Sequence, residues 1–180
     1  ADYWIGSVHN LYDPANGAYH CVDWDREKLA ACRDEMFCGD VLAMAEEYYA
    51  DVAAMAARCP TILGHIDLVT KFNESAAFFN ETAPRYRAAA LEALHAADPE
   101  RTLLEINTGA VSRGYRSAPY PAQFLLRAWR ERGGEIILTA DSHQTGTVVW
   151  GYRQAADWAR AAGYTRCMIL TASGRAACPL

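Results

Sequence analysis

Short apolar runs alternate with longer amphipathic segments along most of the chain. Five runs rich in aliphatic and aromatic residues have the length of buried strands, at 3–8, 61–65, 103–107, 136–139 and 168–170. Between them, apolar residues near helical spacing predict helices over 26–37, 41–58, 84–97, 122–132 and 149–162. Strands separated by helices indicate an α/β fold with a mainly parallel sheet that is covered by helices.

Capping and turn residues mark where several of these elements begin and end. Asp25 and Asp40 are predicted N-caps of the first two helices, because a short carboxylate can accept the free N–H groups of a first turn. Pro60 ends the second helix, and Gly133-Gly134 ends the fourth. Residues 13–17 are turn-forming. With no internal repeat and no linker, the pattern predicts one domain over residues 1–180.

Composition narrows the class of protein. The 180 residues are 52% hydrophobic and 22% charged, which is typical of a globular domain and excludes a disordered or collagen-like chain. A net charge of −5 argues against nucleic-acid binding and favours a small-molecule partner. No apolar run is long enough to cross a membrane, and the first residues do not resemble a secretory leader. The six cysteines form no CxxC pair, so we expect reduced thiols in a cytoplasmic protein.

Ionisable residues follow three of the predicted strands. His9 follows the first strand, His65 ends the second, and Asp141 and His143 follow the fourth. The carboxyl ends of parallel strands form one rim, where active sites are built. Imidazoles and a carboxylate there are suitable ligands for Zn²⁺, Mn²⁺ or Fe²⁺. Taken singly, His9 and His65 could equally be structural histidines, whereas the Asp-x-His pair favours a functional site.

Five further residues near strand ends have two interpretations each. Glu105 and Asn107 could orient a ligand or simply fix the loop that follows them. Arg113 could bind a phosphate through its guanidinium, and Lys71 could be a second phosphate-binding cation, although either could also be a solvated surface residue. Asp67 could orient an imidazole or cap the next turn.

Other catalytic and binding motifs are absent from the sequence. It has no GxGxxG, no Walker motif and no GxSxG, which leaves dinucleotide binding, P-loop chemistry and serine-hydrolase chemistry without support. The aromatic pairs at 48–49 and 78–79 are predicted to pack in the core.

Five segments, taken together and in order, resemble a known family. They are Gly6-Ser7-Val8-His9, the block Gly64-His65 to Asn73, the block Glu105 to Arg116, Pro119-Tyr120-Pro121 and Asp141-Ser142-His143. These segments resemble the histidinol-phosphatases of the polymerase-and-histidinol-phosphatase (PHP) superfamily. The resemblance covers nearly the whole chain, and the long block at 105–121 is its most specific part.

The resemblance implies a fold, an activity and a set of site residues. It implies a distorted (β/α)7 barrel, two or three divalent metal ions (Zn, Mn or Fe), and hydrolysis of L-histidinol phosphate in histidine biosynthesis. His9, His65, Asp141 and His143 correspond to metal ligands, and Arg113 to the arginine that binds the substrate phosphate. Lys71 lies in a segment that is basic in relatives, which makes it a second phosphate-binding candidate. Metal ions would activate water and clamp the phosphoryl group, with Asp141 or a neighbouring histidine such as His143 moving the proton.

The sequence departs from the family at its beginning. The HxH pair of the first strand, further histidine ligands and a metal-bridging glutamate precede the SVH segment in relatives and are not found here. The chain is therefore expected to match the C-terminal two-thirds of a family member, whose closing strand it retains. Without the first strands, sheet edges would be exposed and self-association would be favoured. Two alternatives stay open, a PHP phosphoesterase with another small phosphate substrate and an inactive metal-binding fragment.

Overall fold

The central sheet is mostly parallel, as the sequence pattern predicts. The computed structural model describes residues 2–180. Its larger sheet has six strands in the order β1-β4-β5-β6-β7-β8, and only the last pair is antiparallel. These strands are β1 (Ile5–Gly6), β4 (Ile62–Leu63), β5 (Leu103–Asn107), β6 (Ile136–Thr139), β7 (Arg166–Thr171) and β8 (Gly174–Pro179).

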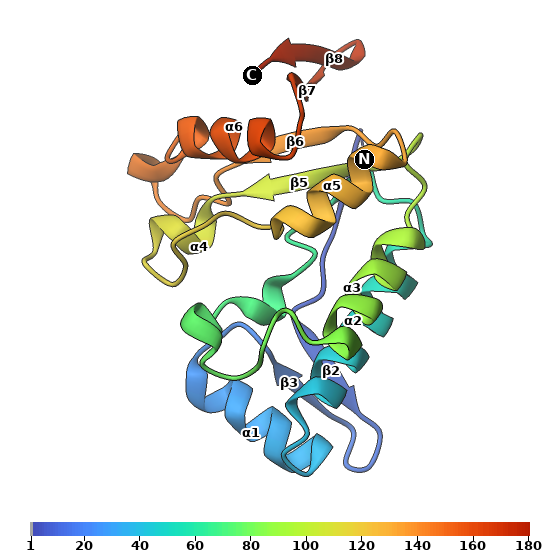
Figure 1. Cartoon of the computed structure of the whole chain (residues 1–180), viewed down its shortest axis with the longest axis vertical. Helices are drawn as coiled ribbons and strands as arrows, with labels where there is room; N and C mark the ends of the chain where they lie inside the picture. Colours follow the sequence, from blue (N-terminus) through green and yellow to red (C-terminus); the bar gives the residue numbers. More distant parts are fainter. Residues whose placement is uncertain (1) are drawn as a thin grey trace.

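Helices connect the parallel strands. They are α1 (Arg26–Phe37), α2 (Val41–Ala56), α3 (Pro84–His95), α4 (Gly109–Ser112), α5 (Gln123–Glu131) and α6 (Tyr152–Ala161), with short 3-10 turns at Leu68–Thr70, Glu74–Ala76 and Thr145–Thr147. In Figure 1, α5 and α6 lie beside β5 and β6, while α1, α2 and α3 extend to the opposite end of the molecule. Helices α2 and α3 pack against each other, and α5 contacts both α3 and α6.

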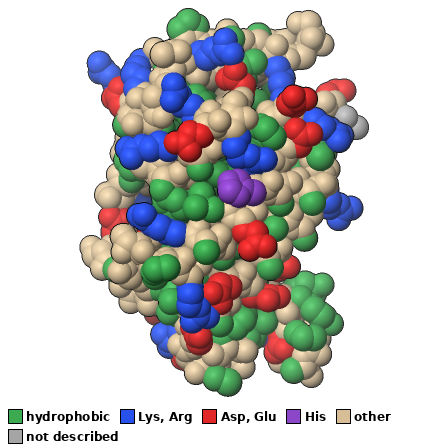
Figure 2. Space-filling view, turned by 45° about the vertical axis from the view of Figure 1, so that its right-hand side comes forward, with side chains coloured by type: hydrophobic (Ala, Val, Ile, Leu, Met, Phe, Trp, Pro, Cys, Tyr) green, Lys and Arg blue, Asp and Glu red, His purple; other side chains and the backbone are tan. Residues whose placement is uncertain are grey.

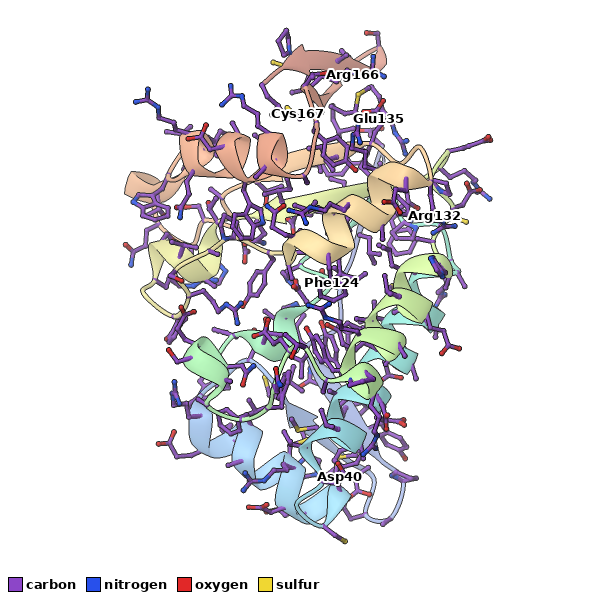
Figure 3. The ribbon with its side chains drawn as sticks, viewed as in Figure 1. Asp40, Phe124, Arg132, Glu135, Arg166 and Cys167 are labelled. Atoms are coloured by element: carbon purple, nitrogen blue, oxygen red, sulfur yellow. The ribbon has the colours of Figure 1, made fainter. Side chains whose placement is uncertain are left out.

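The predicted helix caps are confirmed. The backbone N–H of Lys28 donates to Asp25 Oδ1 over 2.7 Å. Asp40, labelled in Figure 3, accepts the N–H groups of Leu42 and Ala43, both at 3.0 Å. The two carboxylates therefore fix the first turns of α1 and α2 at the predicted positions.

The predicted barrel is not formed by these residues. Within residues 2–180 no strand joins β1 to β8, so the sheet is open and both of these strands lie at its edges. The expected first strand at 3–8 contributes only Ile5 and Gly6 to the sheet, and Ile5 is 48% exposed. Closure into a barrel requires each edge strand to find a partner. Self-association through these edges stays a prediction.

One hairpin and two further elements were not predicted from the sequence. Residues 13–17 are the turn of a hairpin between β2 (Asn10–Asp13) and β3 (Ala18–Cys21), not an isolated loop. Burial alternates along β2, which is the period-2 signal of a strand, but four residues are too few to stand out in the sequence. The other two elements are β8, which consists largely of small residues, and the single-turn helix α4.

A continuous hydrophobic core extends from the β2–β3 hairpin to β7. Tyr48 and Tyr49 are buried in it as expected, and the hydroxyl of Tyr49 donates to that of Tyr86 over 2.9 Å. At the other end of α3, the Arg132 guanidinium donates to the carbonyl oxygen of Leu94 over 2.8 Å (Figure 3). These contacts join α2, α3 and α5 into one packed unit.

Surface charge and hydropathy agree with the composition. On the face shown in Figure 2, basic and acidic side chains are interspersed and form no continuous basic patch. None of the helices described for residues 2–180 combines the length and the apolar character that a membrane span requires. The six cysteines are all unpaired thiols.

Candidate functional site

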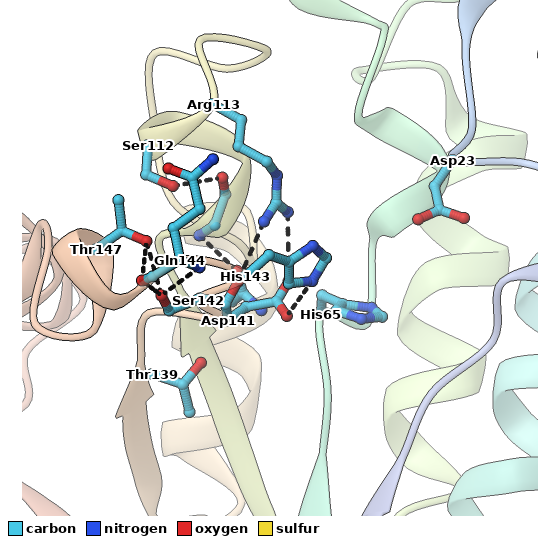
Figure 4. A network of polar contacts seen from close by, with 12 residues as sticks. Asp23, His65, Ser112, Arg113, Thr139, Asp141, Ser142, His143, Gln144 and Thr147 are labelled. Carbon is cyan, nitrogen blue, oxygen red and sulfur yellow. Dashed lines mark hydrogen bonds and ion pairs between the residues drawn. The ribbon is translucent and has the colours of Figure 1, made fainter.

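The predicted site residues lie together at the carboxyl ends of the strands β1, β4 and β6. His9 follows β1, His65 follows β4, and Asp141 and His143 follow β6. The rings of His9 and His65 lie edge to face with their centroids 4.9 Å apart. His143 Nε2 lies 3.6 Å from Asp141 Oδ1 (Figure 4). The strand-end prediction thus yields two neighbouring pairs of donor groups.

Glu105 on β5 ties together the ends of the two flanking strands. Its Oε2 accepts the backbone N–H of His65 over 2.6 Å and the side-chain amide of Asn107 over 3.1 Å. Its Oε1 accepts the hydroxyl of Thr139 over 2.6 Å. Glu105 is buried, and its three hydrogen bonds hold the backbone of His65 and the side chains of Asn107 and Thr139 in place.

Asn107 shapes the loop that carries Arg113. Its Oδ1 accepts the backbone N–H of Gly109 over 2.8 Å, which starts the short helix α4. A Cβ on Gly109 would lie 2.9 Å from both Arg113 Nη2 and Asp141 Oδ2, so a larger residue there would displace the ends of these two side chains. The loop-fixing interpretation of Asn107 is therefore the correct one.

Arg113 contacts the Asp-x-His segment across the site. Its Nη1 donates to the carbonyl oxygen of Asp141 over 3.1 Å, and its Nη2 lies 3.4 Å from Asp141 Oδ2. About a third of each side chain is exposed, 31% for Arg113 and 32% for Asp141. A cavity of about 280 Å³ lies beside them, lined in part by Arg113, His143 and Tyr115. The guanidinium thus lies between a carboxylate and an open cavity, where an anion can reach it.

The backbone is strained at two of the predicted ligands. His65 has φ of 22° and Asp141 has φ of 45°, values that side-chain-bearing residues rarely adopt. Such residues cost on the order of 1–3 kcal/mol each and cluster at active sites. Each lies two positions after the last residue of a strand, His65 after β4 and Asp141 after β6, which is consistent with strain that serves to aim the side chains.

His65 has the properties of a ligand to a cation. It is only 7% exposed, and its Nδ1 has no hydrogen-bond partner among the described residues. Burial lowers the pKa of His65, although the charges of Glu105 and Asp141 act in the opposite direction. The imidazole is therefore neutral near pH 7, which is the form that binds a metal ion.

Asp23 is a member of the site that the sequence analysis did not identify. Its Oδ2 lies 3.3 Å from His9 Nδ1 and 3.8 Å from Lys71 Nζ. Burial alone would raise the pKa of Asp23, but hydrogen bonds from His9 and Cys21 lower it. The hydrogen bond with Asp23 in turn raises the pKa of His9. The available signal was an acidic residue two positions after a strand, which was missed because the hairpin itself was missed.

Lys71 is buried, so its interpretation as a solvated lysine is wrong. Its Nζ donates to the carbonyl oxygen of Asp23 over 2.5 Å and lies 4.8 Å from the centre of the Tyr115 ring. Burial lowers the pKa of Lys71, opposed by the charge of Asp23. Its position next to Asp23 and Tyr115 places a second cation near the site.

Asp67 fulfils neither of its two expected roles. The backbone N–H of Ala122 donates to Asp67 Oδ2 over 2.8 Å, so the carboxylate anchors the beginning of α5. It makes no side-chain cap at the turn that follows it. Complete burial raises the pKa of Asp67 to about 6.

Side chains of the types that bind divalent metal ions lie at these strand ends. In the part of the chain that the structure describes, no group of three or more His, Cys, Asp or Glu side chains is spaced to hold one metal ion. The pairs His9–His65 and Asp141–His143 nevertheless have the nitrogen and oxygen donors that Zn²⁺, Mn²⁺ and Fe²⁺ accept. A larger cavity of about 570 Å³, between the β2–β3 hairpin and α1, contains none of the predicted site residues.

The fold and the strand-end site define an α/β protein of the kind that binds ligands at the carboxyl ends of parallel strands. The crystal structure of a candidate histidinol phosphatase from Listeria monocytogenes has the same fold, with a TM-score of 0.62, over 83% of this chain and 56% of the other. The two sequences are 17% identical. No protein-family model matches the chain.

Curated sequences point to the same group of proteins. A histidinol-phosphatase of Bacillus subtilis is 27% identical over 82% of this chain and 55% of its own length. Proteins named "Probable histidinol-phosphatase" from Deinococcus radiodurans and Schizosaccharomyces pombe are 35% and 25% identical over 86% and 93% of this chain, and over 51% and 53% of their own lengths. The chain spans about half the length of these relatives. The predicted resemblance is confirmed: the chain is similar to part of the histidinol-phosphatases.

Proposed function

We propose that the protein containing this chain is a metal-dependent phosphomonoester hydrolase that converts L-histidinol phosphate and water to L-histidinol and phosphate. The observation that carries the proposal is the convergence of His9, His65, Asp141 and Arg113 at the carboxyl ends of the strands, where Arg113 also lines a cavity of about 280 Å³. The names of the relatives supply the substrate, and we propose histidine biosynthesis in the cytoplasm as the role of the protein.

Arg113 binds the substrate phosphate in this proposal. A guanidinium can contact two phosphoryl oxygens at once, and it keeps its charge at every physiological pH. The contacts with Asp141 at 3.1 and 3.4 Å hold the side chain at the mouth of the cavity before substrate arrives. Lys71 adds a second positive charge, and its Nζ lies 3.8 Å from Asp23 Oδ2.

Divalent ions are proposed to be held by His9, His65, Asp141 and His143. Further ligands would come from a segment that corresponds to the unmatched half of the relatives. Such ions would activate water and neutralise the phosphoryl oxygens. Asp141 or the neighbouring His143 moves the proton; the two side chains lie 3.6 Å apart, and His143 is 72% exposed. In a protein extended to the length of the relatives, strands added next to β1 would close the sheet into a (β/α)7 barrel.

The test is release of phosphate from L-histidinol phosphate with added Mn²⁺ or Zn²⁺, measured for this chain and for a protein extended to the length of the relatives. We expect activity in the longer protein and its loss in Arg113→Ala. Arg127→Ala is the matched control, because Arg127 is exposed and lies outside the site. Unchanged kinetics in Arg113→Ala would contradict the phosphate-binding role.

Two alternatives have distinct outcomes in the same assay. Faster turnover of another small phosphate ester or a nucleotide would indicate a different PHP phosphoesterase. An inactive metal-binding fragment is favoured by the absence of a three-ligand cluster within residues 2–180. Inactivity of both proteins towards every ester, with metal bound, would establish that alternative.

A further inference from the structure

Asp23 contacts two candidate site residues that come from different parts of the chain. Its Oδ2 lies 3.3 Å from His9 Nδ1 and 3.8 Å from Lys71 Nζ. We propose that Asp23 is a positioning residue, which fixes His9 through Nδ1, leaves Nε2 of that ring free for a ligand, and anchors Lys71 on the other side. The inference rests on the proposed function for its catalytic consequence.

The chemistry of the contact determines which nitrogen of His9 carries the proton. A neutral imidazole has one N–H donor and one acceptor nitrogen, whereas an ionised carboxylate only accepts. The nitrogen that faces Asp23 must therefore be protonated, and Nε2 keeps its lone pair. Histidines that bind metal ions commonly donate their second N–H to a carboxylate in this way, which fixes both tautomer and ring orientation.

Asp23 is itself held in a defined orientation. The thiol of Cys21 donates to Oδ1 over 3.2 Å, which leaves Oδ2 directed to His9 and Lys71. The carbonyl oxygen of Asp23 also accepts a hydrogen bond from Lys71 Nζ over 2.5 Å. The side chain is 19% exposed, so water competes little for these contacts.

A purely structural role does not account for this arrangement. Asp25, two residues further on, caps α1 by accepting the N–H of Lys28. Within residues 2–180 the carboxylate of Asp23 accepts no backbone N–H, so it holds no turn or helix end. Its carboxylate contacts are with Cys21, His9 and Lys71, and the last two are the candidate ligand and the candidate phosphate-binding cation.

The primary test is the tautomer of His9, observed by two-bond ¹H–¹⁵N correlation NMR on the 180-residue chain at alkaline pH, where imidazoles are neutral. The His9 signals are assigned by their loss in His9→Gln. We expect the Nδ1–H form in the parent chain and in Asp23→Asn, whose amide oxygen still accepts. In Asp23→Ala we expect a shift to the Nε2–H form, which free histidine favours in water. Asp25→Asn, which preserves the helix cap, is the control.

The second measurement is the Zn²⁺ affinity of the protein extended to the length of the relatives, obtained by competition with a chelator. Loss of the carboxylate in Asp23→Ala should weaken binding by about 10–100-fold, and Asp23→Asn should weaken it less. An Nε2–H form in the parent chain, or a tautomer that does not change in Asp23→Ala, would overturn the inference whatever the activity. A tautomer shift in Asp23→Ala, found together with a protein of the relatives' length that neither binds zinc nor releases phosphate, would instead refute the proposed function and support the positioning role.

Discussion

Replacement of Glu105 tests the view that this buried carboxylate is the scaffold of the site. Its two oxygens accept three hydrogen bonds, from His65 N, Asn107 Nδ2 and Thr139 Oγ1, at 2.6, 3.1 and 2.6 Å. Leucine has a similar shape but accepts none of them. The Thr139 hydroxyl can rotate to another acceptor, whereas the other two donors are fixed.

The cost follows from the number of fixed donors that are left without an acceptor. Each buried, unsatisfied donor costs about 1–3 kcal/mol, so Glu105→Leu should lose about 2–6 kcal/mol of unfolding free energy. Glu105→Gln should lose much less, about 1 kcal/mol. Its amide oxygen can replace Oε2, and its amide N–H can donate to the Thr139 oxygen once that hydroxyl has rotated.

Equilibrium urea unfolding with a reductant present measures the unfolding free energy of both variants. The comparison requires that the slope of this free energy with urea concentration is unchanged between variants. The expected order is parent, then glutamine, then leucine, with a clear gap before leucine. A leucine variant that loses under about 1 kcal/mol, or a glutamine variant that loses as much as leucine, would refute the reasoning. If the leucine variant does not fold, the glutamine variant alone still decides, because its unfolding free energy should fall by only about 1 kcal/mol.

Three further predictions concern packing, pH and phosphate binding. Gly134→Ala should lower the unfolding free energy by about 1–3 kcal/mol, because the added Cβ would collide with the buried Trp129 ring. Gly133→Ala meets open space and should lower it by about 1 kcal/mol, because the φ of Gly133 is 78°. Thermal unfolding compares the two variants. The pKa of Asp67 rises from 3.8 in the unfolded chain to about 6 in the folded protein, so the folded protein binds a proton more tightly at this carboxyl. This proton binding contributes about 3 kcal/mol to the unfolding free energy; the contribution should be complete below pH 4 and lost as the pH rises through 6. Urea unfolding of Asp67→Asn should show a flatter pH profile, and an identical profile would contradict the assignment. In the longer protein, Arg113→Lys should raise KM for L-histidinol phosphate about tenfold because lysine lacks the planar fork, and an unchanged KM would argue against a two-point phosphate contact.

The sequence determined the elements that depend on local signals. The helix starts after Asp25 and Asp40, the strands at 103–107 and 136–139, and the strand-end positions of His65 and Asp141 all follow from capping chemistry and short apolar runs. These signals operate within a few residues, so they are visible in a single chain. Recognition of the histidinol-phosphatase motifs also required only the order and spacing of residues.

The tertiary structure decided everything that depends on distant partners. Asp23 and Lys71 are 48 residues apart, and no local sequence pattern near either residue predicts their contact. Asp67 was expected to orient an imidazole or to cap the next turn, but its partner Ala122 is 55 residues away. The open sheet is a property of the same kind, because the pairing of an edge strand depends on which other strands are present. Long-range pairing and burial fix these features, since they arise from the packing of whole elements and leave no local trace in the sequence.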